Sequence, residues 1–298
     1  MRSRLTQLLA LLFALAMVSA ACGSDSASET DAADAASDTG SEGAALDCAI
    51  ESLPLTEAGK LTIATGEPAY EPWMVDDDPT NKQGFEGAVA YAIAEKMGFA
   101  DADVVWTRSD FDEAIAPGEK PYDFNMQQYS ITADRDKVVD FSLPYYSGQK
   151  SVIALGGSPA ATATNFEELQ AGTWGATIGT TDLDYIENTL GIEDVAVYDT
   201  QADVLSAMAA GQIDATVVAL PTALYLTAVE MDNGVIVGVL PTDPSQTEGD
   251  QMGLLFTDGS ELVGCVNEAI TALTDDGTLE ALAVEWLQGE GDIPEIAS

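Results

Sequence analysis

The residues most able to do chemistry in this chain surround Arg135. This arginine follows a short polar turn in the segment YDFNMQQYSITADRDKVVDFSLPYY, residues 122–146. A guanidinium offers a planar pair of donors that matches a carboxylate, so the placement indicates a grip on a small anion. Outside the first few residues the one other arginine is Arg108. A carboxylate held by a fixed pair of donors would bind one of these two, unless Arg135 forms a surface ion pair with Asp134 or Asp140.

The composition limits the classes of partner. The 298 residues and 46% hydrophobic content are enough for two ordinary domains with their own cores. The formal charge of -41, with no His, would repel nucleic acid and anionic lipid head groups, so we expect no nucleic-acid partner. The acidic excess is spread along the chain, which favours a solvated surface over a cationic ligand as its cause.

The first 22 residues are typical of an export signal. Basic residues precede an apolar run from Leu8 to Val18, which is too short to span a membrane. The small residues before Cys22 resemble a bacterial lipoprotein signal, in which Cys22 becomes the lipidated first residue, although Ser19 stands where Leu is usual. An ordinary cleaved secretory peptide is the alternative. Either way we expect an extracytoplasmic protein, anchored to the cell membrane if the cysteine is lipidated.

The segment 23–45 (GSDSASETDAADAASDTGSEGAA) lacks aromatic residues, Val and Ile and carries many like charges. It cannot bury a core, so it is predicted to be a disordered acidic linker between the anchor and the folded body. Two cysteines remain, Cys48 and Cys265. In an exported protein the pair favours a disulfide over two inert buried thiols.

Alternating strand and helix patterns predict an α/β protein. Residues 60–65 read as a strand, and Val89, Ile93 and Met97 recur every four positions in a helix over 86–97. Later patterns predict strands over 104–106, 173–178 and 215–220 and helices over 182–190, 200–210, 260–273 and up to Leu287. The backbone amides of the turn at 179–181 would lie at a helix N-terminus, where an anion can bind.

A family resemblance rests on six stretches in this order: ATGEPAYEPW, GFEGAVAYAIAEKMGF, SITADRDKVVDFSLPYY, GTTDLDYI, GQIDATVVALPTALY and VNEAITALTDDGTLEALAVEWL. Together they resemble the family 3 extracellular solute-binding proteins of ABC transporters, which bind polar amino acids. The likeness covers residues 47–288, and the pattern SITxxRxxxVDFSxPYY is specific for the family. The segment QYSIT resembles that of an actinobacterial branch of the family.

The resemblance implies a periplasmic-binding-protein-like type II fold, in which two α/β lobes are joined by two hinge strands around a ligand cleft. Residues 46–152 and 249–298 would form the first lobe and residues 153–248 the second. The crossovers would fall near 151–154 and 249–253. Cys48 and Cys265 would then both lie in the first lobe.

The resemblance also assigns roles to positions of this chain. Arg135 would clamp the ligand α-carboxylate with help from Ser130, and Gln128 would offer its backbone carbonyl to the ligand ammonium. Tyr70 would stack over the ligand, with Trp73 as a weaker aromatic candidate. The remaining expected contacts are an apolar wall at Phe111, an acid at Glu67, an amide at Thr181 and a side-chain contact at Asp182.

One position departs from the family pattern. Family members usually have Asp where this chain has Ala219, and that Asp pairs with the ligand ammonium. Burying an ammonium without a charged partner costs several kcal/mol. Either Glu67 or Asp182 substitutes, or the ligand lacks an α-amine. Gln127 and Gln128 are also bulkier than the family's usual residues, so a narrower pocket is expected.

The sequence therefore predicts a lipid-anchored, monomeric solute receptor that delivers an amino acid or related carboxylate to an ABC permease. We expect no enzymatic activity, no cofactor and no metal site, since there is no His and no ligand spacing stands out. The alternatives are a binding lobe that signals to a partner and a cyclic-acid dehydratase on the same fold. In the dehydratase, Glu67 would act as general acid.

Overall fold

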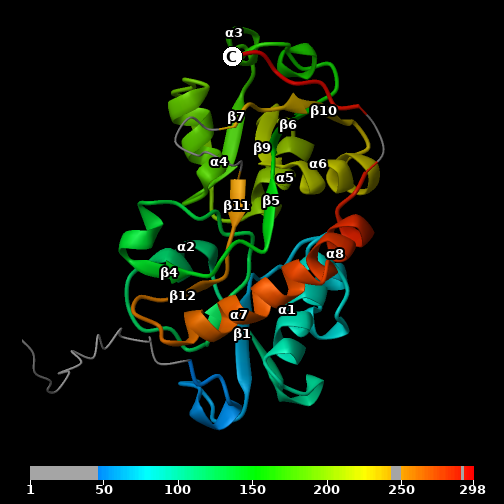
Figure 1. Cartoon of the computed structure of the whole chain (residues 1–298). Helices are drawn as coiled ribbons and strands as arrows, with labels where there is room; N and C mark the ends of the chain where they lie inside the picture. Colours follow the sequence, from blue (N-terminus) through cyan, green and yellow to red (C-terminus); the bar gives the residue numbers. More distant parts are fainter. Residues whose placement is uncertain (1–45, 243–249, 290–291) are drawn as a thin grey trace, which may run out of the picture. The chain divides into compact units, whose positions relative to one another are not determined.

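Two five-stranded sheets organise the protein in a computed structural model, which describes residues 46–242, 250–289 and 292–298 (Figure 1). The strands of the first sheet run in the order β2-β1-β3-β12-β4, and those of the second in the order β10-β6-β9-β7-β8. Each sheet has its own buried apolar core, so the chain forms two α/β lobes. The predicted fold class is confirmed.

The first sheet combines strands from both halves of the chain. Its parallel part is β1 (Leu61–Thr65), β2 (Val104–Arg108) and β3 (Phe124–Asn125), and β12 (Leu255–Thr257) enters antiparallel between β3 and β4 (Val139–Phe141). All five residues of β1 are buried, because the strand lies inside the sheet with helices over it. A late strand thus completes the sheet that the early strands begin.

Three helices cover this sheet: α1 (Phe85–Lys96), α7 (Leu262–Asp275) and α8 (Thr278–Trp286), which pack on one another (Figure 1). Val89 and Ile93 are buried as their spacing predicts, and Gly98 follows the helix at φ 92°, a conformation that glycine adopts readily. The predicted helices over 86–97, 260–273 and up to Leu287 are confirmed to within a few residues. The short helix α2 (Phe111–Ile115) completes the lobe.

The second sheet is built from β6 (Lys150–Leu155), β7 (Trp174–Thr177), β8 (Val195–Tyr198), β9 (Ala215–Ala219) and β10 (Gly234–Val239). Its helices are α3 (Phe166–Leu169), α4 (Thr181–Asp184), α5 (Gln201–Ala209) and α6 (Leu220–Tyr225). Thr200 caps α5 as predicted, because its hydroxyl oxygen accepts a hydrogen bond from the amide of Asp203 at 3.1 Å.

The predicted helix over 182–190 has a different form. It is a single α-helical turn, α4, that continues as a π-helical segment, Tyr185–Thr189, and a second π-helical segment, Leu226–Glu230, follows α6. Short 3-10 turns account for Ile50–Ser52, Val75–Asp77, Pro79–Asn81, Asp101–Asp103, Arg135–Lys137 and Ala160–Thr162.

Two short strands connect the lobes. β5 (Tyr146–Gly148) and β11 (Asp250–Met252) pair antiparallel and lie between the two sheets in Figure 1. They run beside the crossovers expected near 151–154 and 249–253, although residue 249 lies outside the described residues. Each strand continues directly into a sheet, β5 towards β6 and β11 towards β12.

The C-terminal tail packs on the second lobe. Glu295 pairs with Val239 of β10, Ala297 pairs with Asn165, and Ile296 is buried in the second lobe's core. In Figure 1 the chain end lies next to α3. The segment 249–298, expected to stay in the first lobe, therefore includes a tail that crosses back, because an apolar side chain at 296 fills the second core.

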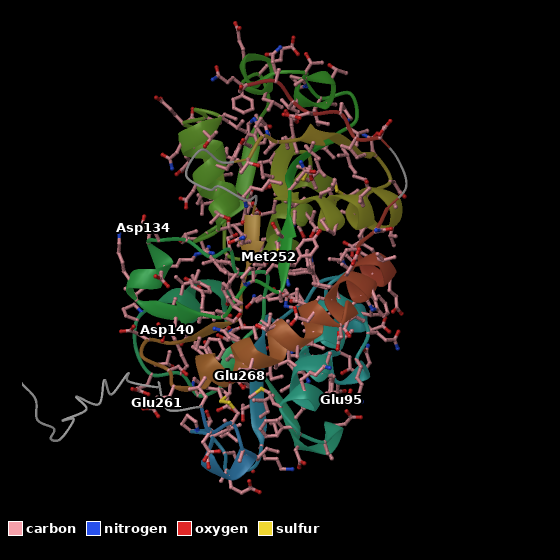
Figure 2. The ribbon with its side chains drawn as sticks, viewed as in Figure 1. Glu95, Asp134, Asp140, Met252, Glu261 and Glu268 are labelled. Atoms are coloured by element: carbon pink, nitrogen blue, oxygen red, sulfur yellow. A yellow bond between two sulfur atoms is a disulfide. The ribbon has the colours of Figure 1, made fainter. Side chains whose placement is uncertain are left out.

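The expected disulfide is present. Cys48 and Cys265 are joined, with their Cα atoms 5.5 Å apart, and the bond ties the segment before β1 to α7 (Figure 2). Both cysteines belong to the first lobe, as expected.

The export signal at 1–22, the lipidated Cys22 and the linker at 23–45 lie outside the described residues. Among the residues that the structure describes, none of the helices has the length and apolar character needed to cross a membrane.

Replacing both cysteines, as Cys48→Ser with Cys265→Ser, should lower the free energy of unfolding by about 2–5 kcal/mol, because the bond closes a loop of 217 residues in the unfolded chain. Urea denaturation of both proteins measures this difference. Reductant should lower the stability of the original chain by a similar amount and leave the double variant unchanged. Equal stability of the two oxidised proteins would contradict a stabilising role for the bond.

Candidate functional site

A cavity of about 390 Å³ lies between the two lobes and is lined by residues from both. Its volume is within the range of pockets that enclose small molecules. All eight residues expected to contact a ligand line it: Glu67, Tyr70, Phe111, Gln128, Ser130, Arg135, Thr181 and Asp182. The fold therefore brings together positions that are up to 115 residues apart in sequence, from Glu67 to Asp182.

Arg135 is the buried cation of the first lobe. Its side chain is 7% exposed, and its Nη1 donates to the carbonyl oxygen of Ser130 at 2.8 Å. Its Nη2 donates to the carbonyl oxygen of Gly179, in the second lobe, at 2.9 Å. Among the described residues it forms no ion pair with any carboxylate. Burial lowers the pKa of this guanidinium, and the charges of nearby acids, Asp250 and Asp182 among them, oppose this shift only in part.

The ring of Phe111, which stacks on Tyr129, packs against Arg135. The guanidinium carbon lies 5.6 Å from the centroid of the Phe111 ring, within the range of a cation–π interaction. Phe111 in turn stacks on Tyr129 at a centroid distance of 4.6 Å. Phe111 is the first residue of α2, so this helix and the buried Tyr129 hold the Phe111 ring against the guanidinium of Arg135. Phe111, predicted to form an apolar wall, therefore contacts Arg135, predicted to bind the ligand carboxylate.

The structure excludes the two other arrangements that the sequence left open. Arg108 is occupied outside the cavity, because it donates to the carboxylate of Asp77 at 2.7 Å and to the carbonyl of Gly66. Asp134 pairs with Lys137, and Asp140 accepts from the amide of Ser260 at 2.9 Å. A surface ion pair of Arg135 with Asp134 or Asp140 was the wrong alternative.

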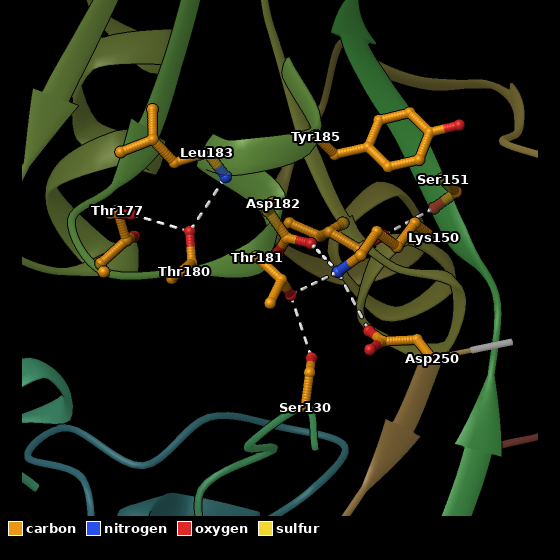
Figure 3. Close-up of polar contacts among 12 residues, drawn as sticks. Ser130, Lys150, Ser151, Thr177, Thr180, Thr181, Asp182, Leu183, Tyr185 and Asp250 are labelled. Atoms are coloured by element: carbon orange, nitrogen blue, oxygen red, sulfur yellow. Dashed lines mark hydrogen bonds and ion pairs between the residues drawn. The ribbon is translucent and has the colours of Figure 1, made fainter. Parts of the chain in front are cut away.

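A second buried cation, Lys150, was missed in the sequence. Its Nζ donates to Thr181 Oγ1 at 2.8 Å, Asp182 Oδ1 at 2.5 Å and Asp250 Oδ2 at 3.0 Å (Figure 3). Burial alone would lower the pKa of Lys150, but the charges of the two carboxylates outweigh it and raise that pKa. One sequence feature pointed to Lys150: it is the last basic residue of the chain and begins an otherwise apolar strand.

Ser130 and Thr181 join the two lobes at the cavity. Ser130 Oγ lies 3.0 Å from Thr181 Oγ1, so one hydroxyl donates to the other across the cleft (Figure 3). Asp182, expected to touch the ligand side chain, gives one oxygen to Lys150.

Gln128 is held in place by a buried acid, Glu86. The amide of Gln128 donates to Glu86 Oε1 at 2.8 Å, and its side-chain nitrogen donates to Oε2. The hydroxyl of Tyr145 also donates to Oε1. Gln128 adopts a φ of 51°, a backbone conformation that is uncommon for residues with a side chain. Glu86 was missed because an acid at the start of a helix usually faces solvent, whereas this one is 0% exposed.

The two aromatic candidates in the loop after β1 have different surroundings. Tyr70 lines the cavity, and its hydroxyl accepts a hydrogen bond from the amide of Ala202 in the second lobe at 3.1 Å. Trp73 does not line the cavity, because it is buried edge-on against Phe85 and donates to the hydroxyl of Thr222 at 2.8 Å. Trp73 is therefore a core residue that also bridges the lobes.

The turn before α4 is fixed by hydrogen bonds of its own residues. The side chain of Thr180 caps the turn, because its hydroxyl oxygen accepts from the amide of Leu183 at 3.1 Å and donates to the carbonyl of Thr177 (Figure 3). The carbonyl of Gly179 accepts from Arg135. The helix has four residues, too few for a substantial macrodipole.

The cavity combines a cationic hydrogen-bond donor with two carboxylates, so it can hold a molecule that carries both charges. Arg135 offers N–H donors and a positive charge. Asp182 and Asp250 place two carboxylates around Lys150 (Figure 3). Within the residues described, no cluster of His, Cys, Asp or Glu has the geometry to hold a metal ion.

This fold and this interlobe cavity define a type II periplasmic binding protein. The chain belongs to the bacterial extracellular solute-binding proteins, family 3, whose family model matches residues 61–289. The family expected from the sequence is confirmed.

The chain is similar to binding proteins of known ligand class. It is 28% identical over 233 residues to the L-cystine-binding protein TcyJ of Escherichia coli, covering 77% of this chain and 83% of that protein. It is 27% identical over 205 residues to ABC transporter arginine-binding protein 1 of Escherichia coli, covering 68% and 81%. Among solved structures, an ancestral arginine-binding protein bound to arginine matches with a TM-score of 0.64, 26% identity, and coverage of 77% and 99%.

Replacing Glu86 by Gln should flatten the dependence of stability on pH. Burial raises the pKa of Glu86 from 4.5 to about 7, despite hydrogen bonds from Tyr145 and Gln128 that favour ionisation. The folded protein therefore holds this proton more tightly than the unfolded chain, and the stability so gained is present below pH ~4.5 and lost as the pH rises through about 7.

The free energy of unfolding, measured by urea denaturation at pH 5 and pH 8, should fall with rising pH by up to about 3 kcal/mol more in the original chain than in Glu86→Gln. Glu95→Gln, which changes an exposed glutamate on the same helix, is the matched control and should keep the original pH dependence. Parallel pH profiles for the original chain and Glu86→Gln would contradict the prediction.

Proposed function

We propose that this protein is an extracytoplasmic solute-binding lipoprotein that captures an amino acid by its carboxylate and delivers it to an ABC permease. The observation that supports this most strongly is Arg135, a buried guanidinium that lines the cavity and forms no ion pair among the described residues. A buried charge without a partner is costly, so a ligand carboxylate that pairs with it gains much of that energy on binding.

The ligand would be enclosed by closure of the lobes. Arg135 reaches the carbonyl of Gly179, Ser130 reaches Thr181, and Tyr70 reaches Ala202, so the contacts that close the cleft lie at the expected binding residues. A ligand that touches both sides favours the closed state by its greater affinity for that state. The closed form is then the form presented to the permease.

The remaining residues have supporting roles in this proposal. Ser130 assists at the carboxylate, Phe111 forms an apolar wall, and Tyr70 covers the ligand. The backbone carbonyl of Gln128 faces the ligand ammonium, while Glu67, which is exposed, lies near the far end of the solute. Thr181 and Asp182 contribute from the second lobe after closure.

The relatives support an amino acid as the ligand. The proteins that this chain resembles are named for L-cystine and for arginine, and both of those molecules carry an α-carboxylate and an α-amine. The signal sequence and acidic linker support export and attachment through a lipidated Cys22, which would keep a monomeric receptor close to its permease.

Replacing Arg135 by Ala should weaken amino-acid binding by about 2–5 kcal/mol, because the ligand carboxylate loses its paired charge in a buried site. Titration calorimetry with the amino acid that most raises the melting temperature in a screen measures the change. Arg108→Ala is the matched control, since Arg108 is bonded to Asp77 outside the cavity. Unchanged binding by Arg135→Ala would overturn the proposed function.

A further inference from the structure

One carboxylate oxygen of the cavity has no partner among the residues that the structure describes. Asp250 lies in the connecting strand β11, lines the cavity, and has a side chain that is 8% exposed. Its Oδ2 accepts from Lys150, whereas its Oδ1 is buried and has no hydrogen-bond partner among the described residues. Buried carboxylate oxygens nearly always accept hydrogen bonds, so Oδ1 is available to a donor on the ligand.

Lys150 positions this carboxylate and has no capacity left for a ligand. An ammonium group has three N–H donors, and Lys150 directs them to Thr181, Asp182 and Asp250 (Figure 3). The formal charges of this cluster, one lysine and two aspartates, sum to about -1. Arg135 brings a positive charge to the same cavity, so a ligand that carries both a carboxylate and an ammonium group leaves the summed formal charge of these residues unchanged.

Ala219 is a small residue beside Lys150 at the cavity. Ala219 of β9 lies directly opposite Lys150 of β6 in the antiparallel register. Opposite residues of such a pair project from the same face of the sheet, so the small methyl group leaves space beside the lysine. Asp250 approaches the same lysine from the connecting strand β11.

The acid is close to the anion clamp. Ser130, whose carbonyl holds Arg135, forms an antiparallel bridge with Met252, two residues after Asp250 on the same strand. Residues two apart on a strand face the same side, at a spacing of roughly 6.5–7 Å. A molecule with a carboxylate at Arg135 can thus place a neighbouring amine at Asp250.

We propose that Asp250 is the acceptor for the ligand's ammonium group and that the site therefore selects α-amino acids over the same acids without the amine. This inference rests on the proposed function, in which Arg135 holds the carboxylate. Of the two substitutes expected from the sequence, Glu67 is exposed, and Asp182, which also gives an oxygen to Lys150, has a side chain that is 24% exposed against 8% for Asp250. An amine-free ligand would leave Asp250 Oδ1 buried without a donor.

The first test uses the unmodified protein and matched ligands. A thermal-shift screen of the twenty protein amino acids, L-cystine and L-ornithine selects the strongest binder, which calorimetry compares with the acid that has hydrogen in place of its α-amine. For L-arginine that acid is 5-guanidinopentanoate. The amine-free acid should bind at least about thirtyfold more weakly.

The outcomes separate the inference from the function on which it rests. Equal affinity for both ligands would overturn the inference and leave the carboxylate receptor intact. Binding of neither ligand set would overturn the proposed function together with the inference.

The second test replaces Asp250 by Asn, which keeps the shape and the oxygen facing Lys150. Asp250→Asn should lose at least about thirtyfold in affinity for the amino acid and little for the amine-free acid, whereas Arg135→Ala should weaken both. Asp275→Asn, an equal charge change at an exposed site on α7, is the control. Undiminished amino-acid affinity in Asp250→Asn would overturn the inference.

A rescue variant distinguishes the acid's role from general damage. Adding Ala219→Asp to Asp250→Asn restores a carboxylate beside Lys150 from strand β9. The double variant should recover at least about tenfold of the lost affinity for the amino acid. A double variant no better than Asp250→Asn, with both proteins folded by their melting curves, would count against the proposal. The comparison of ligands on the unmodified chain decides the matter if either variant does not fold.

Discussion

The structure of the site depends on one buried guanidinium. Arg135 is covered by protein, lies against the Phe111 ring, and donates to carbonyl oxygens from both lobes, yet pairs with no carboxylate among the described residues. In a chain with 51 acidic residues, keeping acids away from this one cation requires a dedicated arrangement. Lys137 pairs with Asp134, and Asp140 is bonded to the backbone, so these two nearby acids are occupied elsewhere.

The second buried cation, Lys150, differs from Arg135 because it is paired with carboxylates. Lys150 is fully paired, and its three hydrogen bonds connect β6, α4 and β11 (Figure 3). Because Thr181 bonds both Lys150 and Ser130, one polar network runs from the paired lysine to the arginine clamp. Such a network couples the positions of the two lobes to the geometry of the cavity, since moving either lobe breaks buried hydrogen bonds.

Much of the fold could be predicted from local patterns. The spacing of Val89 and Ile93 gave α1, and Thr200 with Gly211 bounded α5, because caps and helical periodicity act over a few residues. The helix after Gly179 was extended too far as an α-helix, because its switch to π-helical bonding has no local sequence pattern. The tail around Ile296 was placed in the wrong lobe for a similar reason: any apolar core can accept an isoleucine.

The sequence by itself determined the family and pointed to eight of the residues that line the cavity, Arg135 among them, because these belong to contiguous motifs. Tertiary structure alone decided which acids and bases meet. Lys150 and Asp250 are 100 residues apart in sequence, and Gln128 and Glu86 are 42 apart. Neither separation indicates that the two residues are in contact. Burial decides the rest, because a carboxylate or ammonium acts differently in solvent and in a closed cavity, and the sequence does not state which side chains the folded chain encloses.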